Sequence, residues 1–150
     1  MWELSHTTPD PVELHRLLHM LAQRGVTHAA LETSSHGLAQ YRVDGVRFTA
    51  GAFTNISRDH LDYHASFEDY LAQKMRLFRE VLPDYGTAVI HSDDAASKSV
   101  IAVVEARGLR IITVGRTGRD IRLVDIKRQG FSQRLTLEYE NKRMNVILPL

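Results

Sequence analysis

The pattern that most constrains the fold is a repeated step from a short apolar run into a cluster of polar residues. Three apolar runs show it, at residues 26–31, 48–53 and 87–90. Short apolar runs between helical patterns are typical of the buried strands of a parallel sheet. The carboxyl ends of such strands line the crevice in which ligands bind. We therefore predict that the three polar clusters that follow these runs, at residues 32–37, 54–60 and 91–94, meet at one edge of the sheet.

Helical patterns separate these runs. The first predicted helix has Asp10 as its N-cap and Gly25 beyond its C-terminal end. A second helix is predicted from Ser66 to Pro83, and a third near residues 95–107. Strand and helix therefore alternate along most of the chain, as expected for an α/β fold.

The C-terminal part of the chain has a different texture. A strand is predicted at residues 110–114, and three segments of alternating polarity follow Gly115, at residues 121–126, 134–139 and 143–148. Turn-forming residues separate these three segments, which predicts an antiparallel meander. The predicted fold class is thus α/β, a mostly parallel sheet flanked by helices, with a small antiparallel meander at its C-terminal end.

Composition excludes several classes of protein. The formal net charge is +1, which gives no general attraction to nucleic acid or to an anionic membrane surface. No apolar run approaches the roughly 20 residues of a membrane span. The absence of cysteine excludes disulfides and thiolate metal sites, and it is consistent with a cytoplasmic protein.

The first polar cluster contains Glu32 and residues 33–37, with the sequence Thr-Ser-Ser-His-Gly. A carboxylate at a strand end can bind Mg²⁺, which prefers oxygen ligands. Neighbouring hydroxyl groups can hold phosphate or sugar oxygens. The alternative is a capped turn before a helix, because Ser and Thr are common N-caps.

The second cluster leads into the segment Arg58 to His64, which contains two histidines four residues apart, His60 and His64. On a helix these two side chains could bind a metal together with Asp62, which would suit a metal-dependent hydrolase. The alternative is a polar surface loop in which aspartates neutralise the basic side chains.

Lys74 lies on the apolar stripe of the second predicted helix, formed by positions 67, 71, 78 and 82. A lysine in such a place can extend its ammonium group to water. If it cannot, desolvation favours the neutral amine, which can capture CO₂ as a carbamate. A carbamate would add an oxygen ligand for Mg²⁺ beside Glu32 and His60.

Taken in order, these motifs resemble the Mur ligase family, and the resemblance runs over essentially the whole chain. The segments that carry it are Thr7-Thr8-Pro9, Leu31-Glu32-Thr33-Ser34-Ser35-His36-Gly37-Leu38 with Gln40 and Arg42, Phe53-Thr54-Asn55-Ile56-Ser57-Arg58-Asp59-His60-Leu61-Asp62-Tyr63-His64, and Tyr70-Leu71-Ala72-Gln73-Lys74. They are most similar to the members that join meso-diaminopimelate or lysine to UDP-N-acetylmuramoyl-L-alanyl-D-glutamate in peptidoglycan synthesis.

The resemblance implies an ATP-dependent ligase that forms an amide bond through an acyl phosphate. By this resemblance Glu32 and His60 hold magnesium, and Lys74 corresponds to a carbamylated lysine that places a second magnesium ion. The residues expected to hold the UDP-muramoyl-dipeptide are Thr7, Thr8, Ser34, Gln40 and Arg42.

Two positions depart from the family pattern. His91 stands where relatives carry an asparagine on the adenine side of the site, and His6 replaces an asparagine before the two threonines.

No G-x-x-x-x-G-K-[ST] phosphate loop occurs in the sequence. The resemblance therefore implies a fragment of the central ATP-binding domain, with the phosphate loop upstream, a C-terminal domain downstream and a monomeric parent enzyme. We expect this chain alone to be inactive. Other hypotheses are another Mur ligase, a folylpolyglutamate synthetase, the metal-dependent hydrolase, or a non-catalytic protein that binds a nucleotide sugar.

Overall fold

The computed structural model describes residues 7–57 and 63–150. The chain divides into two compact units. We call residues 1–48 with 58–83 the helical unit, and residues 49–57 with 84–150 the sheet unit.

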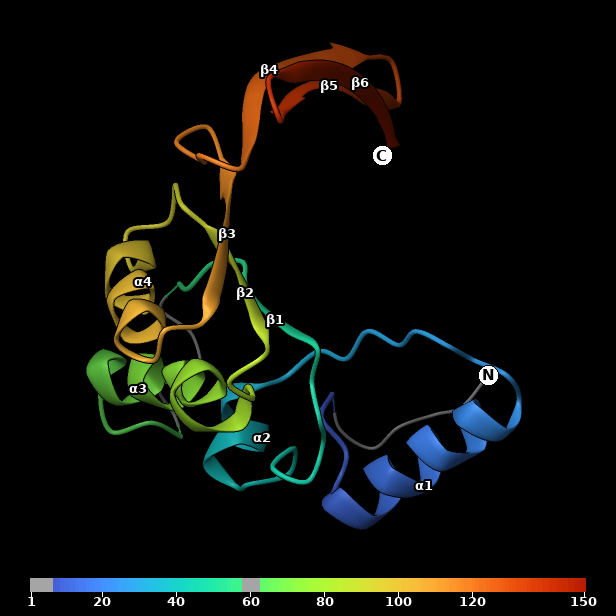
Figure 1. Cartoon of the computed structure of the whole chain (residues 1–150), viewed down its shortest axis with the longest axis vertical. Helices are drawn as coiled ribbons and strands as arrows, with labels where there is room; N and C mark the ends of the chain where they lie inside the picture. Colours follow the sequence, from blue (N-terminus) through green and yellow to red (C-terminus); the bar gives the residue numbers. More distant parts are fainter. Residues whose placement is uncertain (1–6, 58–62) are drawn as a thin grey trace. The chain divides into compact units, whose positions relative to one another are not determined.

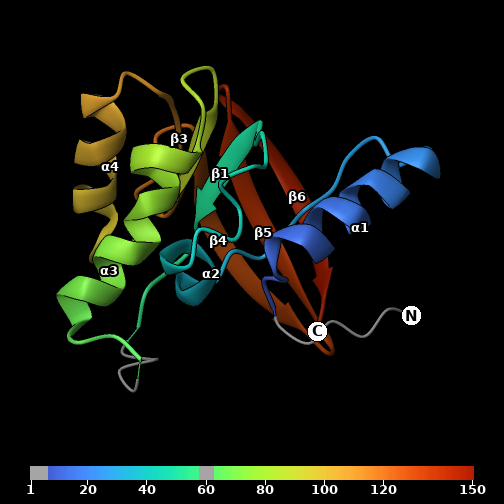
Figure 2. The ribbon, with the colours of Figure 1, turned by 90° about the horizontal axis from the view of Figure 1, so that it is seen from below.

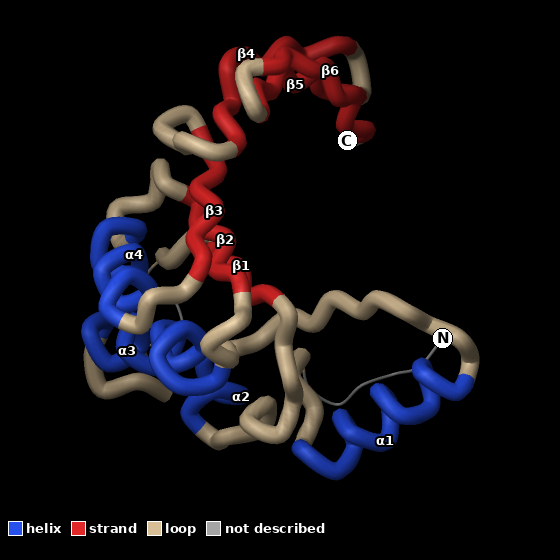
Figure 3. The backbone as a smooth tube through the Cα atoms, viewed as in Figure 1, coloured by secondary structure: helices blue, strands red, loops and turns tan. Residues whose placement is uncertain are grey.

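The sheet unit contains one six-stranded mixed sheet (Figures 1 and 3). In sheet order the strands are β1 (Ala50–Phe53), β2 (Thr87–His91), β3 (Arg110–Gly115), β4 (Ile121–Gln129), β5 (Ser132–Tyr139) and β6 (Lys142–Pro149). Strands β1 to β4 pair in parallel, and β4 to β6 pair antiparallel. Helix α4 (Ser97–Ala106) connects β2 with β3 and packs against both. The predicted α/β fold class with a C-terminal meander is therefore confirmed.

The meander contains β4, β5 and β6, which lie side by side in Figure 2. Its strands are longer than the alternating segments predicted. The turn between β5 and β6 has Glu140 at φ 49° and Asn141 at φ 60°. Two successive left-handed residues are typical of the tight hairpin turn whose twist matches that of its strands.

The helical unit contains α1 (Pro11–Gln23), α2 (Ser35–Ala39), α3 (Phe67–Arg76) and the π-helix η1 (Leu77–Val81). The predicted caps are present. Asp10 accepts hydrogen bonds from the amides of Val12 and Glu13, and Ser66 accepts one from the amide of Asp69. Gly25 follows α1 with φ 77°, a backbone conformation that glycine adopts without steric cost.

The strand predicted at residues 26–31 is wrong. These residues form neither helix nor strand, and residues 26–30 are exposed. An extended segment becomes a strand only when a neighbour completes its backbone hydrogen bonds. Among the described residues, no strand pairs with this segment. Two of its four apolar side chains are those of the small residues Ala29 and Ala30, and residues 26–30 are exposed, so the segment buries too little surface to compensate.

The buried face of α3 and η1 also differs from the predicted stripe. Phe78 and Leu82 are buried as expected, whereas Phe67 and Leu71 are only half-buried. The amide of Leu82 donates to the carbonyl of Leu77, five residues earlier, as in a π-helix. The wider π-helical turn rotates the buried face of η1 relative to that of α3. A constant spacing of 3.6 residues per turn therefore does not predict which residues are buried.

Arg76 is a buried charge inside the helical unit, with a side chain that is 9% exposed. Its guanidinium group donates to both carboxylate oxygens of Asp44, to Glu80 Oε2 and to the carbonyl of Leu38, and it stacks on the Tyr41 ring. The hydrogen bond with Asp44 contributes most to raising the pKa of Arg76. These bonds tie the end of α3 to α2 and to the turn at Asp44.

Asp93 organises the loops of the sheet unit. Its carboxylate accepts hydrogen bonds from the amide of Arg116 at 2.7 Å, the amide of Thr117 at 2.8 Å and the Thr117 hydroxyl at 2.7 Å. These bonds hold the turn after β3 against the loop after β2. They lower the pKa of Asp93 to about 2, with the Thr117 hydroxyl as the largest cause.

We predict that Arg76→Ala destabilises the chain by about 3 kcal/mol, because it leaves a buried carbonyl and the Asp44 carboxylate without their partner. Urea unfolding monitored by circular dichroism measures the change. Arg79→Ala, which removes an exposed arginine of η1, serves as the control and should unfold like the wild type. Equal unfolding midpoints for the two variants would contradict a structural role for Arg76.

We also predict that Asp93 makes stability depend on pH in the acid range. Its pKa is lowered in the folded state, so its contribution is present above the ordinary value of 3.8 and is lost as the pH falls towards about 2. Asp93→Asn should therefore flatten the decline of the urea midpoint below about pH 5. Thr117→Ala, which removes the largest cause of the lowered pKa, should make the decline smaller, because the pKa of Asp93 in the folded state then lies closer to 3.8. Parallel pH profiles for all three proteins would refute the prediction.

Candidate functional site

Thr8 is at the centre of the predicted substrate-binding residues and is 1% exposed. Its hydroxyl donates to the carbonyl of Glu32 at 3.1 Å and accepts from the amide of Ser34 at 2.9 Å. A β-carbon built on Gly37 would lie 2.7 Å from the Thr8 side chain, closer than such contacts allow. The glycine of the first polar cluster is therefore needed for Thr8 to pack against α2.

Ser34 is the N-cap of α2, and its hydroxyl accepts a hydrogen bond from the amide of Gly37 at 3.0 Å. The capped-turn interpretation of the first cluster is therefore correct as local geometry. It leaves a ligand-binding role open, because a hydroxyl oxygen has two lone pairs as well as one donor.

Arg42 and Gln40 extend this network. Arg42 Nη1 donates to the carbonyl of Thr8 at 2.7 Å, and Arg42 Nε donates to Gln40 Oε1 at 2.9 Å. Gln40 Nε2 in turn donates to the Tyr63 hydroxyl at 3.2 Å. The structure thus brings together four of the five predicted substrate-binding residues, while Thr7 is exposed at the edge of the described chain.

Of the three predicted magnesium ligands, the structure describes Glu32 and Lys74. Glu32 is exposed, and its carboxylate has no hydrogen bond or ion pair with any described residue. Lys74 is half-buried, with Nζ 5.2 Å from the centre of the Tyr70 ring. His60 lies outside the described residues, as does Asp62. Within the described ranges, no group of three or more His, Cys, Asp and Glu side chains could hold a metal ion.

His64 was predicted as a metal ligand or a surface residue, and the structure supports neither. It is 4% exposed, with Nε2 2.9 Å from Ser35 Oγ and Nδ1 3.3 Å from Asp69 Oδ2. Because both ring nitrogens have partners, His64 offers no free lone pair to a metal. Sequence reasoning did not find Ser35 or Asp69, since nothing local in the sequence links them with His64.

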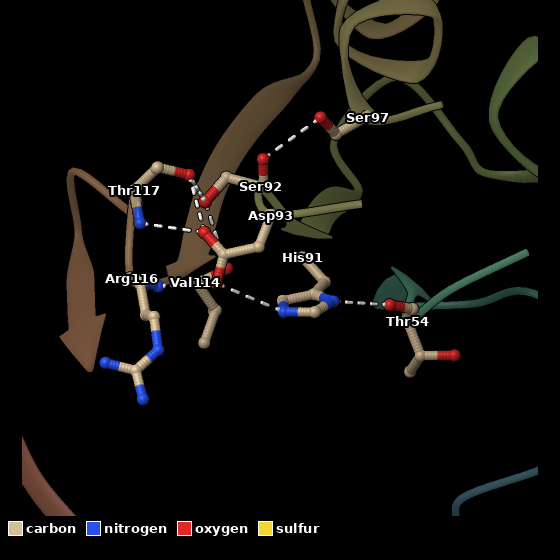
Figure 4. Close-up of polar contacts among 8 residues, drawn as sticks. All are labelled: Thr54, His91, Ser92, Asp93, Ser97, Val114, Arg116 and Thr117. Carbon is tan, nitrogen blue, oxygen red and sulfur yellow. Dashed lines mark hydrogen bonds and ion pairs between the residues drawn. The ribbon is translucent and has the colours of Figure 1, made fainter. Parts of the chain in front are cut away.

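Residues 54–56 after β1 meet residues 91–94 at the end of β2 in the sheet unit, as predicted for the described part of these two clusters (Figure 4). His91 Nδ1 donates to the carbonyl of Thr54 at 2.8 Å, and the amide of Ile56 donates to Asp94 Oδ2 at 3.1 Å. Asp93 lies on the other side of His91, with Oδ2 3.5 Å from His91 Nε2. The first cluster does not follow a strand and belongs to the helical unit, so the prediction of three converging strand ends was wrong for that cluster.

A cavity of about 900 Å³ in the sheet unit was not predicted. Its lining includes Arg110, Arg116, Arg119 and Arg122, together with Asp120, Glu138 and Glu140. The carboxylates offset most of the positive charge, and Arg122 donates to Glu138 at 2.7 Å. The arginines come from β3, the following turn and β4, so no short sequence motif indicates the cavity.

Among the described residues, the structure has no helix of the length and apolar character needed to cross a membrane.

Comparison with known proteins gives concordant matches. The chain is 55% identical over 150 residues to the UDP-N-acetylmuramoyl-L-alanyl-D-glutamate–2,6-diaminopimelate ligase of Bradyrhizobium diazoefficiens, with 97% of this chain covered. It is 50% identical over 146 residues to the enzyme of the same name from Brucella melitensis, again with 97% of this chain covered. The chain spans 31% and 30% of the lengths of these two relatives.

A solved structure of a UDP-N-acetylmuramoyl-L-alanyl-D-glutamate–2,6-diaminopimelate ligase superposes with a TM-score of 0.81 and 32% identity. The superposition covers 91% of this chain and 28% of that one. The Mur ligase middle domain matches residues 2–150. This chain therefore belongs to the Mur ligase family and corresponds to its middle domain.

Proposed function

We propose that this chain is the central-domain part of an enzyme that adds 2,6-diaminopimelate to UDP-N-acetylmuramoyl-L-alanyl-D-glutamate, a UDP-N-acetylmuramoyl-tripeptide synthetase. The observation that carries the proposal is the hydrogen-bonded network of Thr8, Ser34, Gln40 and Arg42 in the helical unit. These are the residues that the family resemblance assigns to the UDP-muramoyl-dipeptide. The names of the two curated relatives supply the substrate and the amino acid.

Arg42 is well suited to an anionic part of this substrate. A guanidinium group has five N–H donors and stays charged at all physiological pH values. Bonds to Thr8 and Gln40 hold its plane in place and use three of these donors. The remaining donors can therefore bind a carboxylate or phosphate with little loss of side-chain entropy on binding.

The proposed reaction is ATP-dependent amide bond formation. The γ-phosphate of ATP passes to the free carboxylate of the dipeptide and forms an acyl phosphate. The amine of the amino acid attacks the acyl carbon, and phosphate leaves from the tetrahedral intermediate. Two anions must approach each other in the first step, so positioning and charge neutralisation are the main requirements.

The donor set of the helical unit is compatible with magnesium. Glu32 offers an exposed carboxylate oxygen, the kind of ligand that Mg²⁺ prefers. Lys74 as an ammonium group cannot bind a cation, but its carbamate would supply oxygen. Glu32, His60 and carbamylated Lys74 would hold Mg²⁺, which when bound would neutralise charge on the reacting phosphate groups.

Further parts of the enzyme are required for activity. We propose that the phosphate loop lies upstream, that a downstream domain selects the amino acid, and that the enzyme is a cytoplasmic bacterial monomer. Lysine is the alternative amino acid, and the assay below distinguishes it from diaminopimelate. The metal-dependent hydrolase is less well supported, because both His64 nitrogens are engaged within the protein.

We predict that the full-length protein releases ADP only when it is given the UDP-muramoyl-dipeptide together with meso-diaminopimelate. Lys74→Ala should lower kcat by about 100-fold or more, because it removes the carbamate proposed to bind the metal. Acetate or formate should restore part of the activity of this variant by replacing the missing carboxylate. Lys98→Ala, at an exposed position of α4, is the matched control and should keep wild-type turnover.

The outcomes separate the hypotheses. Turnover with lysine in place of diaminopimelate would change the proposed amino acid. If the protein releases no ADP with either amino acid, the ligase hypothesis is contradicted. Full activity in Lys74→Ala would refute the role of this lysine.

We further predict that the isolated 150-residue chain forms no tripeptide product, because it has no phosphate loop to hold the triphosphate. Product analysis by mass spectrometry, with the full-length enzyme as the positive control, tests this. Ligation by the isolated chain would show that the proposed division of the site among domains is wrong.

A further inference from the structure

A chain of hydrogen bonds runs from the half-exposed Asp69 through the buried His64 to the buried Ser35 and links two elements of the helical unit. Ser35 is the first residue of α2, and Asp69 lies in the first turn of α3. The distances are 2.9 Å from Ser35 Oγ to His64 Nε2 and 3.3 Å from His64 Nδ1 to Asp69 Oδ2. Ser35 is 1% exposed and His64 is 4% exposed, so solvent cannot easily replace either partner.

The proton positions in this chain follow from the chemistry of its groups. Asp69 also accepts hydrogen bonds from Gln73 Nε2 and the amide of Ala65. The bond from Gln73 contributes most to lowering the pKa of Asp69, so the carboxylate remains ionised. An ionised carboxylate only accepts, so His64 Nδ1 donates to it. In the neutral imidazole, Nε2 then accepts the hydroxyl proton of Ser35.

The order Asp–His–Ser is that of nucleophilic triads, but the surroundings of Ser35 exclude that role. A nucleophile must reach the substrate, whereas Ser35 is fully enclosed. The His64 ring is also surrounded by other rings, with centroid distances of 5.0 Å to Tyr63, 5.2 Å to Tyr70 and 5.5 Å to His36. Such an enclosure suits a fixed connection between elements rather than a reacting group.

The positions of the neighbouring residues indicate what this connection controls. Ser34, a proposed substrate ligand, immediately precedes Ser35. Gln40, at the C-terminal end of α2, donates to the hydroxyl of Tyr63, which immediately precedes His64. The segment that contains His64 therefore holds both ends of α2, and both ends carry residues proposed to bind the UDP-muramoyl-dipeptide.

We propose that Asp69, His64 and Ser35 form a positioning relay, in which Asp69 fixes the imidazole and the imidazole fixes the first turn of α2 for binding of the UDP-muramoyl-dipeptide. This inference rests on the proposed function. None of the three residues needs to touch the substrate. Their effect is on the placement of Ser34 and Gln40, and thus on substrate affinity rather than on the chemical step.

Two substitutions of His64 separate the two links of the relay. The amide nitrogen of asparagine takes the place of Nδ1, so His64→Asn keeps the bond to Asp69 and loses the bond to Ser35. The longer glutamine side chain takes its amide group to the place of Nε2, so His64→Gln keeps the bond to Ser35. Ser35→Ala removes the same bond as His64→Asn from the other side.

Steady-state kinetics of the full-length enzyme test the relay. We expect Ser35→Ala and His64→Asn each to raise KM for the UDP-muramoyl-dipeptide roughly tenfold with kcat little changed, the scale of one lost buried hydrogen bond. His64→Gln should give a KM between those of the wild type and of His64→Asn, because it keeps the bond to Ser35 and loses the bond by which Asp69 fixes the side chain. The double variant Ser35→Ala/His64→Asn should be no worse than either single variant, because both remove one interaction. Ser99→Ala and His19→Asn, at exposed positions, are the controls.

Wild-type KM values in Ser35→Ala and His64→Asn would overturn the relay and leave a purely structural role. Additive effects in the double variant would also overturn it, since the two residues would then act independently. Thermal unfolding of the wild type, Ser35→Ala, His64→Asn and the double variant provides a double-mutant cycle that does not depend on activity. If the wild type releases no ADP, the proposed function fails. If the unfolding data show no coupling between Ser35 and His64, the relay itself is contradicted.

Discussion

The helical unit depends on one buried cation. The Arg76 guanidinium group has little contact with water, so each of its donors needs an acceptor from the protein. The acceptors come from Leu38 at α2, from the turn at Asp44 and from Glu80 in η1. If one of these segments moved away, the buried guanidinium group would lose an acceptor, and an unpaired buried donor destabilises the fold. The residues proposed to bind the substrate lie on or next to the same segments, so their positions follow from this requirement.

Carboxylates have the corresponding role in the sheet unit. Asp93 and Asp94 follow β2 and accept hydrogen bonds from backbone amides of other loops, at Arg116, Thr117 and Ile56. Loop amides without partners would destabilise the fold, and a carboxylate can satisfy several of them at once. The two adjacent aspartates therefore have a structural explanation that holds whether or not a nucleotide binds nearby. His91 donates from Nδ1 to the carbonyl of Thr54 at 2.8 Å.

The sequence predicted those features whose causes are local. The caps at Asp10 and Ser66, the turn at Asn141 and the alternation of the meander strands each depend on a few consecutive residues. Several features that need a distant partner were missed or predicted wrongly. Residues 26–31 have an apolar pattern but no pairing strand in the described chain. His64 has the spacing of a metal ligand, but its partner Ser35 lies 29 positions earlier, which no local pattern reveals.

The proposed substrate residues are bonded to one another before any substrate is present, and this affects how they can bind. Ser34 accepts from Gly37, Thr8 joins Glu32 to Ser34, and Arg42 holds both Thr8 and Gln40. A side chain held in this way loses little rotamer freedom on binding, so more of each new hydrogen bond contributes to affinity. The same bonds limit the donors and acceptors that remain free. Affinity and selectivity for the ligand therefore have a common origin in this network, and a variant that loosens one bond within it should weaken both.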